Sequence, residues 1–344
     1  MRTEADVSAH IGVPAAIMYA QAFSTISSVI PCFSKRGDII VADRAVNYPI
    51  RKGIQISRST VFWYEHNDIA DLERVLQKVV RMQKGKKLTR RFIVTEAISE
   101  HVGDKLDLPA VVALKHKYKF RIILDESLSY GVIGSRGAGL TDASRTDPNE
   151  IDMIIGSLSG PLIGGGGFCA GSADVVEHQR ITSSSYTFSA ALPALLAVTA
   201  SQTIAIMQCE EGERLRDTLL DNTRALREQL DPRSNFVRCS SALENPIQLV
   251  VLRDDVVKQR GLTRDEEEQI VADVVDDCLG RGVFVARLRS LPPELGASPR
   301  EEQDRWQPKP AIKVCVTTGL TRKEIERAGV EIRHAVTKIM QKRK

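Results

Sequence analysis

The alternation of short apolar runs with helical periodicity in the first half of the chain limits its fold more than any other feature. Apolar, β-rich runs occur at 37–43, 91–96, 121–125 and 151–156. Between the first two, apolar residues from Leu72 to Val80 recur at three-and-four spacing behind Asp68, a candidate N-cap, and 108–118 is similar. Such a pattern is typical of a parallel sheet with helices on both faces. Ligands of such sheets bind beyond the carboxyl ends of the strands, so chemistry is expected in the loops after Asp125 and Gly156.

The second half has a different pattern, which predicts a smaller α+β domain. A helical stretch at 192–230 is followed by strands at 247–252, 283–286 and 312–316, and by helices that begin at the capping boxes 263–266 and 321–324. We therefore expect an α/β large domain at 1–208, with a mostly parallel sheet, and a small C-terminal α+β domain at 209–344. The apolar stretch 190–207 contains Pro193 and several hydroxyl residues, which favour a buried connecting helix over a membrane span. The segment 291–310, with five prolines, predicts an exposed loop.

Charge and cysteine content exclude several classes of function. The 48 Lys and Arg residues against 44 Asp and Glu residues leave a net charge of +4, too small to favour nucleic acid as a partner. Basic clusters at 84–91, 115–119 and 342–344 can contact anionic lipid, although a solvated surface is the more ordinary interpretation. The six cysteines include no CxxC pair and the histidines have no metal-ligand spacing, so we expect neither a metal site nor a disulfide framework.

The segment 125–139 carries the most informative motif. A carboxylate at the end of a strand, followed by several glycines, can direct negative charge into a cleft while the backbone approaches a ligand. Glycines alone are weak evidence, because any turn with positive φ selects them. A second glycine-rich stretch occupies 164–167, and the chain has neither a GxxxxGK[ST] motif nor a strand-linked GxGxxG, which disfavours nucleotide binding.

Together these segments resemble the α-oxoamine synthases, which are pyridoxal-phosphate enzymes of aminotransferase fold type I. Residues 125–139 resemble the strand end and glycine turn of that family, 19–25 its phosphate-binding turn, 66–68 its His-Asn-Asp and 186–189 its Phe-Ser segment. Within the family, 34–39, 89–94, 126–129 and 174–180 look like the first long-chain-base subunits of serine palmitoyltransferase. The resemblance covers nearly the whole chain and implies the fold type I architecture.

The departures from the family pattern concern the catalytic residues. The family holds its cofactor on a lysine, and Gly160 occupies that position. There is no lysine between Lys119 and Lys258, so a local shift cannot supply one. Two family histidines align with Asn47 and Leu128. We therefore predict that the chain has no catalytic residue of its own.

The resemblance also implies cofactor contacts. Asp125 would pair with the pyridinium nitrogen, and segment 186–190 would reach across a dimer interface toward the neighbour's phosphate. The expected cofactor-binding residues are Asp125, Ala22, Phe23, Asn47, Phe188 and Ser189. Two alternatives stay open: Asp125 can be a strand-end carboxylate satisfied by the following turn, and Ser189 can cap a helix at 190–200.

The function implied is that of a non-catalytic subunit of serine C-palmitoyltransferase. The complex would condense L-serine with palmitoyl-CoA to give 3-ketodihydrosphingosine, with pyridoxal 5'-phosphate bound mainly by a lysine-bearing partner subunit. The resemblance also implies the cytosolic face of the endoplasmic reticulum membrane, with no transmembrane segment in this chain and a large domain truncated at its N-terminus. The alternatives are a self-sufficient synthase, which Gly160 argues against, and a scaffold or regulatory protein that has lost the partnership.

Overall fold

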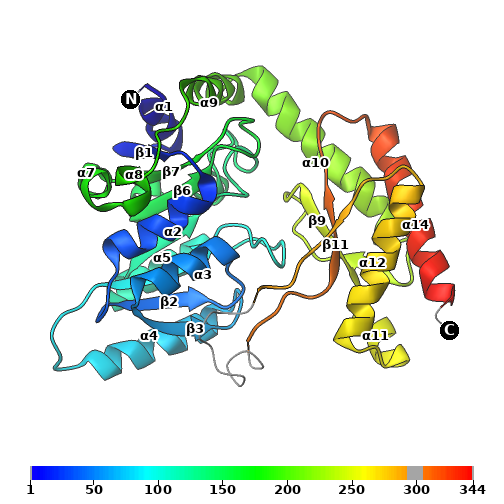
Figure 1. Ribbon diagram of the computed structural model, residues 1–344, viewed down its shortest axis with the longest axis horizontal. Helices are drawn as coiled ribbons and strands as arrows, with labels where there is room; N and C mark the ends of the chain where they lie inside the picture. The colour runs from blue at the N-terminus through cyan, green and yellow to red at the C-terminus, as the bar shows by residue number, and fades with distance from the viewer. Residues whose placement is uncertain (1, 293–304, 343–344) are drawn as a thin grey trace. The chain divides into compact units, whose positions relative to one another are not determined.

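The described part of the chain forms two units, each built around its own sheet. The structure is a computed structural model that describes residues 2–292 and 305–342. The first unit comprises Met1–Glu100 and Lys105–Glu213, and the second comprises His101–Asp104 and Arg214–Lys344 (Figure 1). Whether each unit folds as an independent domain stays a prediction.

A seven-stranded sheet forms the centre of the first unit, in the order β1-β7-β6-β5-β4-β2-β3. Strand β7 pairs antiparallel with β1 and β6, whereas β2–β3, β2–β4, β4–β5 and β5–β6 pair parallel. The mostly parallel α/β fold class is therefore confirmed. The strands are β1 (Ala15–Tyr19), β2 (Ile39–Asp43), β3 (Thr60–Tyr64), β4 (Arg91–Glu96), β5 (Arg121–Asp125), β6 (Met153–Ser157) and β7 (Gly167–Gly171).

Successive residues of a strand point to opposite faces of the sheet, and apolar residues occur on both faces here. Helices cover both faces and bury these residues. Ile40, Phe92 and Ile123 pack with α2, α3 and α7 on one face. On the other face, α4 contacts β2 and β3 while α5 contacts β5. The helices of this unit are α1 (Arg2–Ile11), α2 (Ala22–Phe33), α3 (Tyr48–Ser57), α4 (Ile69–Gln83), α5 (Leu108–Tyr118), α6 (Leu140–Ala143), a 3-10 turn (Pro148–Glu150), α7 (Ala173–Thr182), α8 (Ser184–Thr187) and α9 (Ala194–Met207).

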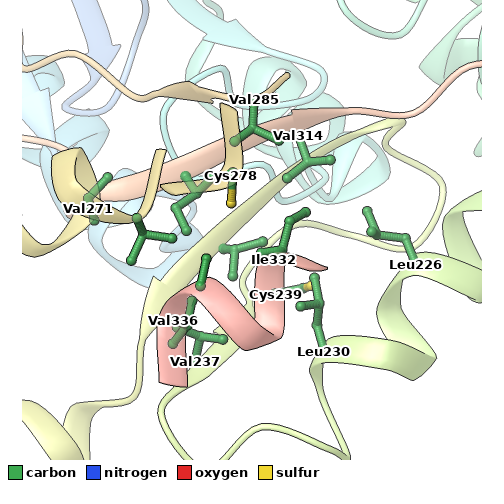
Figure 2. Packing of buried hydrophobic residues seen from close by; sticks show 14 of the residues in the cluster. Leu226, Leu230, Val237, Cys239, Val271, Cys278, Val285, Val314, Ile332 and Val336 are labelled. Atoms are coloured by element: carbon green, nitrogen blue, oxygen red, sulfur yellow. The ribbon is translucent and has the colours of Figure 1, made fainter. Parts of the chain in front are cut away.

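The second unit contains an antiparallel four-stranded sheet in the order β10-β11-β9-β8. Its strands are β8 (Val237–Cys239), β9 (Ile247–Leu252), β10 (Ala286–Arg287) and β11 (Ala311–Cys315), and its helices are α10 (Glu210–Leu230, whose first turn belongs to the first unit), α11 (Asp254–Arg260), α12 (Arg264–Gly280) and α14 (Arg322–Lys342). Figure 2 shows the apolar core of this unit, where Leu226 of α10, Val271 of α12 and Ile332 of α14 pack toward strand residues such as Val314. The antiparallel sheet and its helices match the expected α+β character.

Helix capping occurs where the sequence predicts it. The Asp68 side chain accepts a hydrogen bond from the Asp71 backbone N–H at 2.9 Å and begins α4. Thr263 and Glu266 form the expected capping box of α12. At the start of α14, Thr321 donates to the Glu324 carboxylate from its backbone N–H at 2.7 Å.

Other expectations are wrong. The single helix expected at 192–230 is two helices, α9 and α10, separated by Gln208 and Cys209. In α9 the buried residues are Ala200, Ile204 and Met207, so the helix is not the buried connector that its composition predicts. Its apolar side chains extend around the whole helix, and those that do not pack within the unit remain exposed. The strand expected at 283–286 is the shorter β10, and 293–304 of the expected loop lie outside the described residues.

No helix within residues 2–292 and 305–342 combines the length and apolar character needed to cross a bilayer.

Candidate functional site

Three buried polar side chains meet where the parallel strands of the large sheet end. Asp125 is the last residue of β5 and lies beside Glu96, the last residue of β4. Asn47 follows β2 and is the N-cap of α3. The exposed fractions are 3% for Asp125, 7% for Glu96 and 6% for Asn47. The loops after the strands therefore bring these side chains together, at the edge where a ligand is expected.

The Asn47 side chain joins the two carboxyl groups. Its Nδ2 donates to Asp125 Oδ2 at 2.9 Å and to Glu96 Oε1 at 3.0 Å, and its Oδ1 accepts from the Ile50 N–H at 3.0 Å. The Asn47 backbone N–H donates to Glu96 Oε2 at 3.1 Å, and the Ser127 N–H donates to Asp125 Oδ1 at 2.9 Å. Both oxygens of Asp125 thus accept hydrogen bonds from within the chain, as the strand-end alternative for this residue requires.

Burial dominates the electrostatics of this network. It raises the pKa of Asp125, and the hydrogen bonds from Ser127 and Asn47 oppose that rise. Burial also raises the pKa of Glu96 well above its ordinary value, and the neighbouring charge of Asp125 adds to the effect. Because two adjacent buried carboxylates disfavour simultaneous ionisation, the pair favours retaining a proton.

The expected phosphate-binding turn lies at the same edge of the sheet. β1 ends at Tyr19, in register with Gly167, which in turn is opposite Ser157 at the end of β6. α2 then begins at Ala22, and its N-cap residue Gln21 forms no side-chain cap, so no capping side chain occupies the first backbone N–H groups of α2. Phe23 is 48% exposed. A role for Ala22 and Phe23 in holding a phosphate stays a prediction.

Gly160 lies in the exposed loop between β6 and β7. An ideal Cβ built on Gly160 has no atom within 4 Å, and its φ is not in the left-handed region. The backbone therefore does not impose glycine here, and a Cβ would be accommodated.

Neither Phe188 nor Ser189 forms a hydrogen bond to the Asn47 network in the described part of the chain. Phe188 is 86% exposed and Ser189 is also exposed. The alternative role of Ser189 as a helix cap is wrong, because α9 begins at Ala194 with Pro193 as its N-cap. Proline at 193 delays the start of the helix, since the preceding residue is disfavoured in helical conformation.

A second buried network holds the glycine turn, and it was not predicted from the sequence. The Glu126 carboxylate accepts from the Leu140 N–H at 2.9 Å and from the Ser129 hydroxyl, and burial raises its pKa to about 7. His10, which is fully buried, contacts the Tyr130 hydroxyl through Nδ1 at 2.9 Å and the Arg136 carbonyl oxygen through Nε2 at 2.9 Å. The carbonyl can only accept, so Nε2 carries the proton and Nδ1 accepts from Tyr130. A carboxylate directly after Asp125 was the available signal for this network.

The residues at this edge do not fit pyridoxal phosphate in the manner of the family. There is no lysine from 120 to 257, Asp125 bonds to Ser127 and Asn47, and Asn47 replaces an imidazole. Within the described residues, no cluster of histidine, cysteine or carboxylate side chains has the arrangement of a metal site.

Comparison with known proteins identifies relatives over nearly the whole chain. Residues 5–328 match the family Aminotransferase class I and II. Serine palmitoyltransferase 1 of Dictyostelium discoideum is 35% identical over 94% of this chain and 66% of its own length. Long chain base biosynthesis protein 1c of Oryza sativa is 35% identical over 98% of this chain and 66% of its own length. The chain thus spans just under two thirds of these relatives.

Solved structures share the fold. A variant of the serine palmitoyltransferase from S. paucimobilis superposes with a TM-score of 0.82 at 21% identity, over 99% of this chain and 77% of that chain. This superposition establishes the fold type I architecture.

Proposed function

Because the chain belongs to the aminotransferase class I and II family, we propose that it acts as the lysine-less subunit of a serine palmitoyltransferase. The complex would condense L-serine with palmitoyl-CoA to give 3-ketodihydrosphingosine, at the cytosolic face of the endoplasmic reticulum membrane. The names of the relatives and the sequence resemblance support this assignment.

The observation that carries the non-catalytic role is Gly160. A Cβ at this position would meet no atom within 4 Å, so the absence of a lysine is not imposed by crowding at the backbone. A chain that kept the fold but lost this lysine can take part in the reaction when a partner supplies the lysine. The Asn47 network supports the same conclusion, because both oxygens of the Asp125 carboxylate accept hydrogen bonds from Asn47 and Ser127 of the same chain.

The cofactor, held by the partner subunit, would supply the electron sink for the reaction. This chain would contribute a binding surface. Phe188 and Ser189, both exposed, would approach the partner's cofactor phosphate across the interface, as their resemblance to the Phe-Ser segment implies. The Ser189 hydroxyl can donate a hydrogen bond to an anion.

The exposed apolar residues near this segment support an interface with a partner. Phe188 is 86% exposed, Leu195 76% and Val198 56%, and Leu195 and Val198 belong to α9. A cluster of exposed apolar side chains on one segment is characteristic of protein contact surfaces. Stable subunit interfaces bury apolar surface of this kind.

Reconstitution tests the proposal. The chain and a lysine-bearing homologue are expressed separately and together, and release of free CoA is measured with serine and palmitoyl-CoA present. We expect co-purification, and activity in the pair that is lost when the partner's lysine is replaced by alanine. Activity of this chain alone would indicate a self-sufficient synthase. Failure to co-purify with a homologue that is fully active alone would indicate a scaffold.

A further inference from the structure

The amino-terminal edge of the large sheet, opposite the Asn47 network, gathers basic residues from four separate loops. The first residues of β2, β3 and β4 lie in register, since Ile39 is opposite both Thr60 and Arg91, and β5 begins opposite Phe92. The segments that precede these strands therefore meet at one edge. We define the basic edge by seven exposed cations of these segments, which are Lys35, Arg36, Arg58, Lys84, Lys86, Lys87 and Lys119. Arg90, also exposed, is left out because its side chain donates to the Phe33 carbonyl oxygen.

None of these seven side chains has an ion-pair partner among the described residues. The carboxylates nearest in the fold are already engaged. Asp38 is 7% exposed and accepts from the Lys35 and Arg90 backbone N–H groups at 3.0 and 2.9 Å. Glu73 pairs with Lys117 at 2.6 Å, and Asp152 pairs with Lys115 at 3.0 Å. The net charge of the whole chain is +4, so the charged residues outside this set together sum to a negative value.

Exposed apolar side chains are interspersed with these cations. Leu88, next to Lys87 in the loop that follows α4, is 86% exposed. Met82 in the last turn of α4 is 45% exposed, and Ile56 in the last turn of α3 is 59% exposed. Each of them lies within two residues of a cation of the basic edge.

We propose that the basic edge is a docking surface for an anionic membrane. Cations attract the negative surface potential of anionic lipid, and apolar side chains among them can enter the headgroup region. A nucleic acid would bind the cations, but contacts with exposed Leu88, Met82 and Ile56 would not strengthen that binding. The combination of cations and apolar side chains therefore favours lipid. Asp125 and Asn47 lie at the opposite end of the same parallel strands, so docking through the basic edge would not involve them.

Vesicle co-sedimentation tests this surface with the full chain. Vesicles contain phosphatidylcholine alone or with about 30% phosphatidylserine, to supply the negative surface potential. We expect binding to the anionic vesicles, weak or no binding to the neutral ones, and a loss of affinity as salt rises from about 0.1 to about 0.5 M, because salt screens the attraction.

Charge reversal of Lys84, Lys86 and Lys87 to glutamate should weaken binding at least about 100-fold, since each basic residue near an anionic surface contributes roughly fivefold. The matched control reverses Arg214, Lys258 and Lys323 of the second unit, which are also exposed and give the same change in net charge. We expect this control to bind at least ten times more tightly than the first variant. Thermal melting monitored by circular dichroism checks that both variants fold.

A second variant, Leu88→Ser, leaves the charge unchanged. It should reduce the fraction bound, most clearly at high salt, where the electrostatic contribution is smallest. Equal binding by the two charge-reversal variants would overturn the proposal, as would absence of binding to anionic vesicles at low salt. Displacement from vesicles by a short single-stranded RNA at equal charge concentration would assign the edge to nucleic acid instead.

Discussion

At the scale of single residues, Asn47 shows how one side chain changes the chemistry of a strand edge. It caps α3 and donates to two buried carboxyl groups that come from β4 and β5. The sequence motif identified Asp125 but not Glu96, because the three residues come together only through the order of the strands. The role of Asn47 follows from that order, which no local pattern contains.

Replacement Asn47→Ala should therefore lower the free energy of unfolding by about 2–4 kcal/mol. Loss of the cap contributes about 1 kcal/mol and loss of hydrogen bonds to buried carboxyl groups the remainder. Urea unfolding of the full chain measures the change. Asn149→Ala removes an exposed amide that bonds to Asp147 at 2.8 Å, and this control should stay within about 0.5 kcal/mol of the wild type. Equal effects of the two substitutions would show that the buried network does not stabilise the fold.

Ser189 allows a second substitution at this scale. Since Ser189 is exposed and does not cap α9, Ser189→Asp should leave the stability of the isolated chain within about 0.5 kcal/mol of the wild type. In the reconstituted complex it should lower cofactor affinity about tenfold or more, because the new carboxylate would lie near a phosphate. Titration of the cofactor into the complex, followed by its absorbance, measures this. Unchanged affinity would remove Ser189 from the proposed interface.

At the scale of elements, three strands were predicted to the residue, namely β4, β5 and β9, because their boundaries are distinct. β4 and β5 each begin at arginine and end at a carboxylate, and their apolar interiors are unambiguous. The short strands β1, β3 and β7 were not predicted. β7 begins and ends with glycine, which is a weak strand former, and β3 is only partly buried. Their positions depend on pairing with neighbours rather than on their own composition.

Glu126, in the connection from β5 to α6, makes the free energy of unfolding depend on pH. Burial raises the pKa of Glu126 to about 7, so the folded state holds a proton that the unfolded chain releases above its ordinary pKa, near 4.5. The wild type should therefore lose stability relative to Glu126→Gln as pH rises from 4.5 to about 7, by roughly 3 kcal/mol, and the difference should be constant at higher pH. Urea unfolding of both proteins at several pH values measures the difference. A difference that stays constant across this range would show that the Glu126 carboxyl group is already charged in the folded protein at pH 4.5.

The exposed side of α9 gives the corresponding test of the interface. Leu195→Lys should leave the isolated chain folded, because Leu195 is 76% exposed, but should weaken binding to the lysine-bearing partner about tenfold or more. Gln202→Lys adds the same charge to an exposed polar position of the same helix and should have a smaller effect. Affinity is measured by titrating labelled partner. If both variants bind like the wild type, α9 is not part of the contact.

At the scale of the whole molecule, the first unit has two exposed regions of different chemistry. One is the apolar segment with Phe188 and α9, and the other is the basic edge at the amino ends of the parallel strands. The sequence contained the residues of both, but their exposure and their grouping required the sheet order. The sequence also contained the central observation, Gly160 in place of a lysine, and the structure adds that its surroundings are open.

The most direct test of this account locates the lysine that holds the cofactor. The complex of this chain with its lysine-bearing partner is loaded with pyridoxal phosphate and reduced with borohydride, and tryptic peptides are examined by mass spectrometry for pyridoxyl-lysine. The account predicts that the modified lysine lies in the partner subunit and that the lysines of this chain remain unmodified. A stoichiometric pyridoxyl group on any lysine of this chain would contradict it.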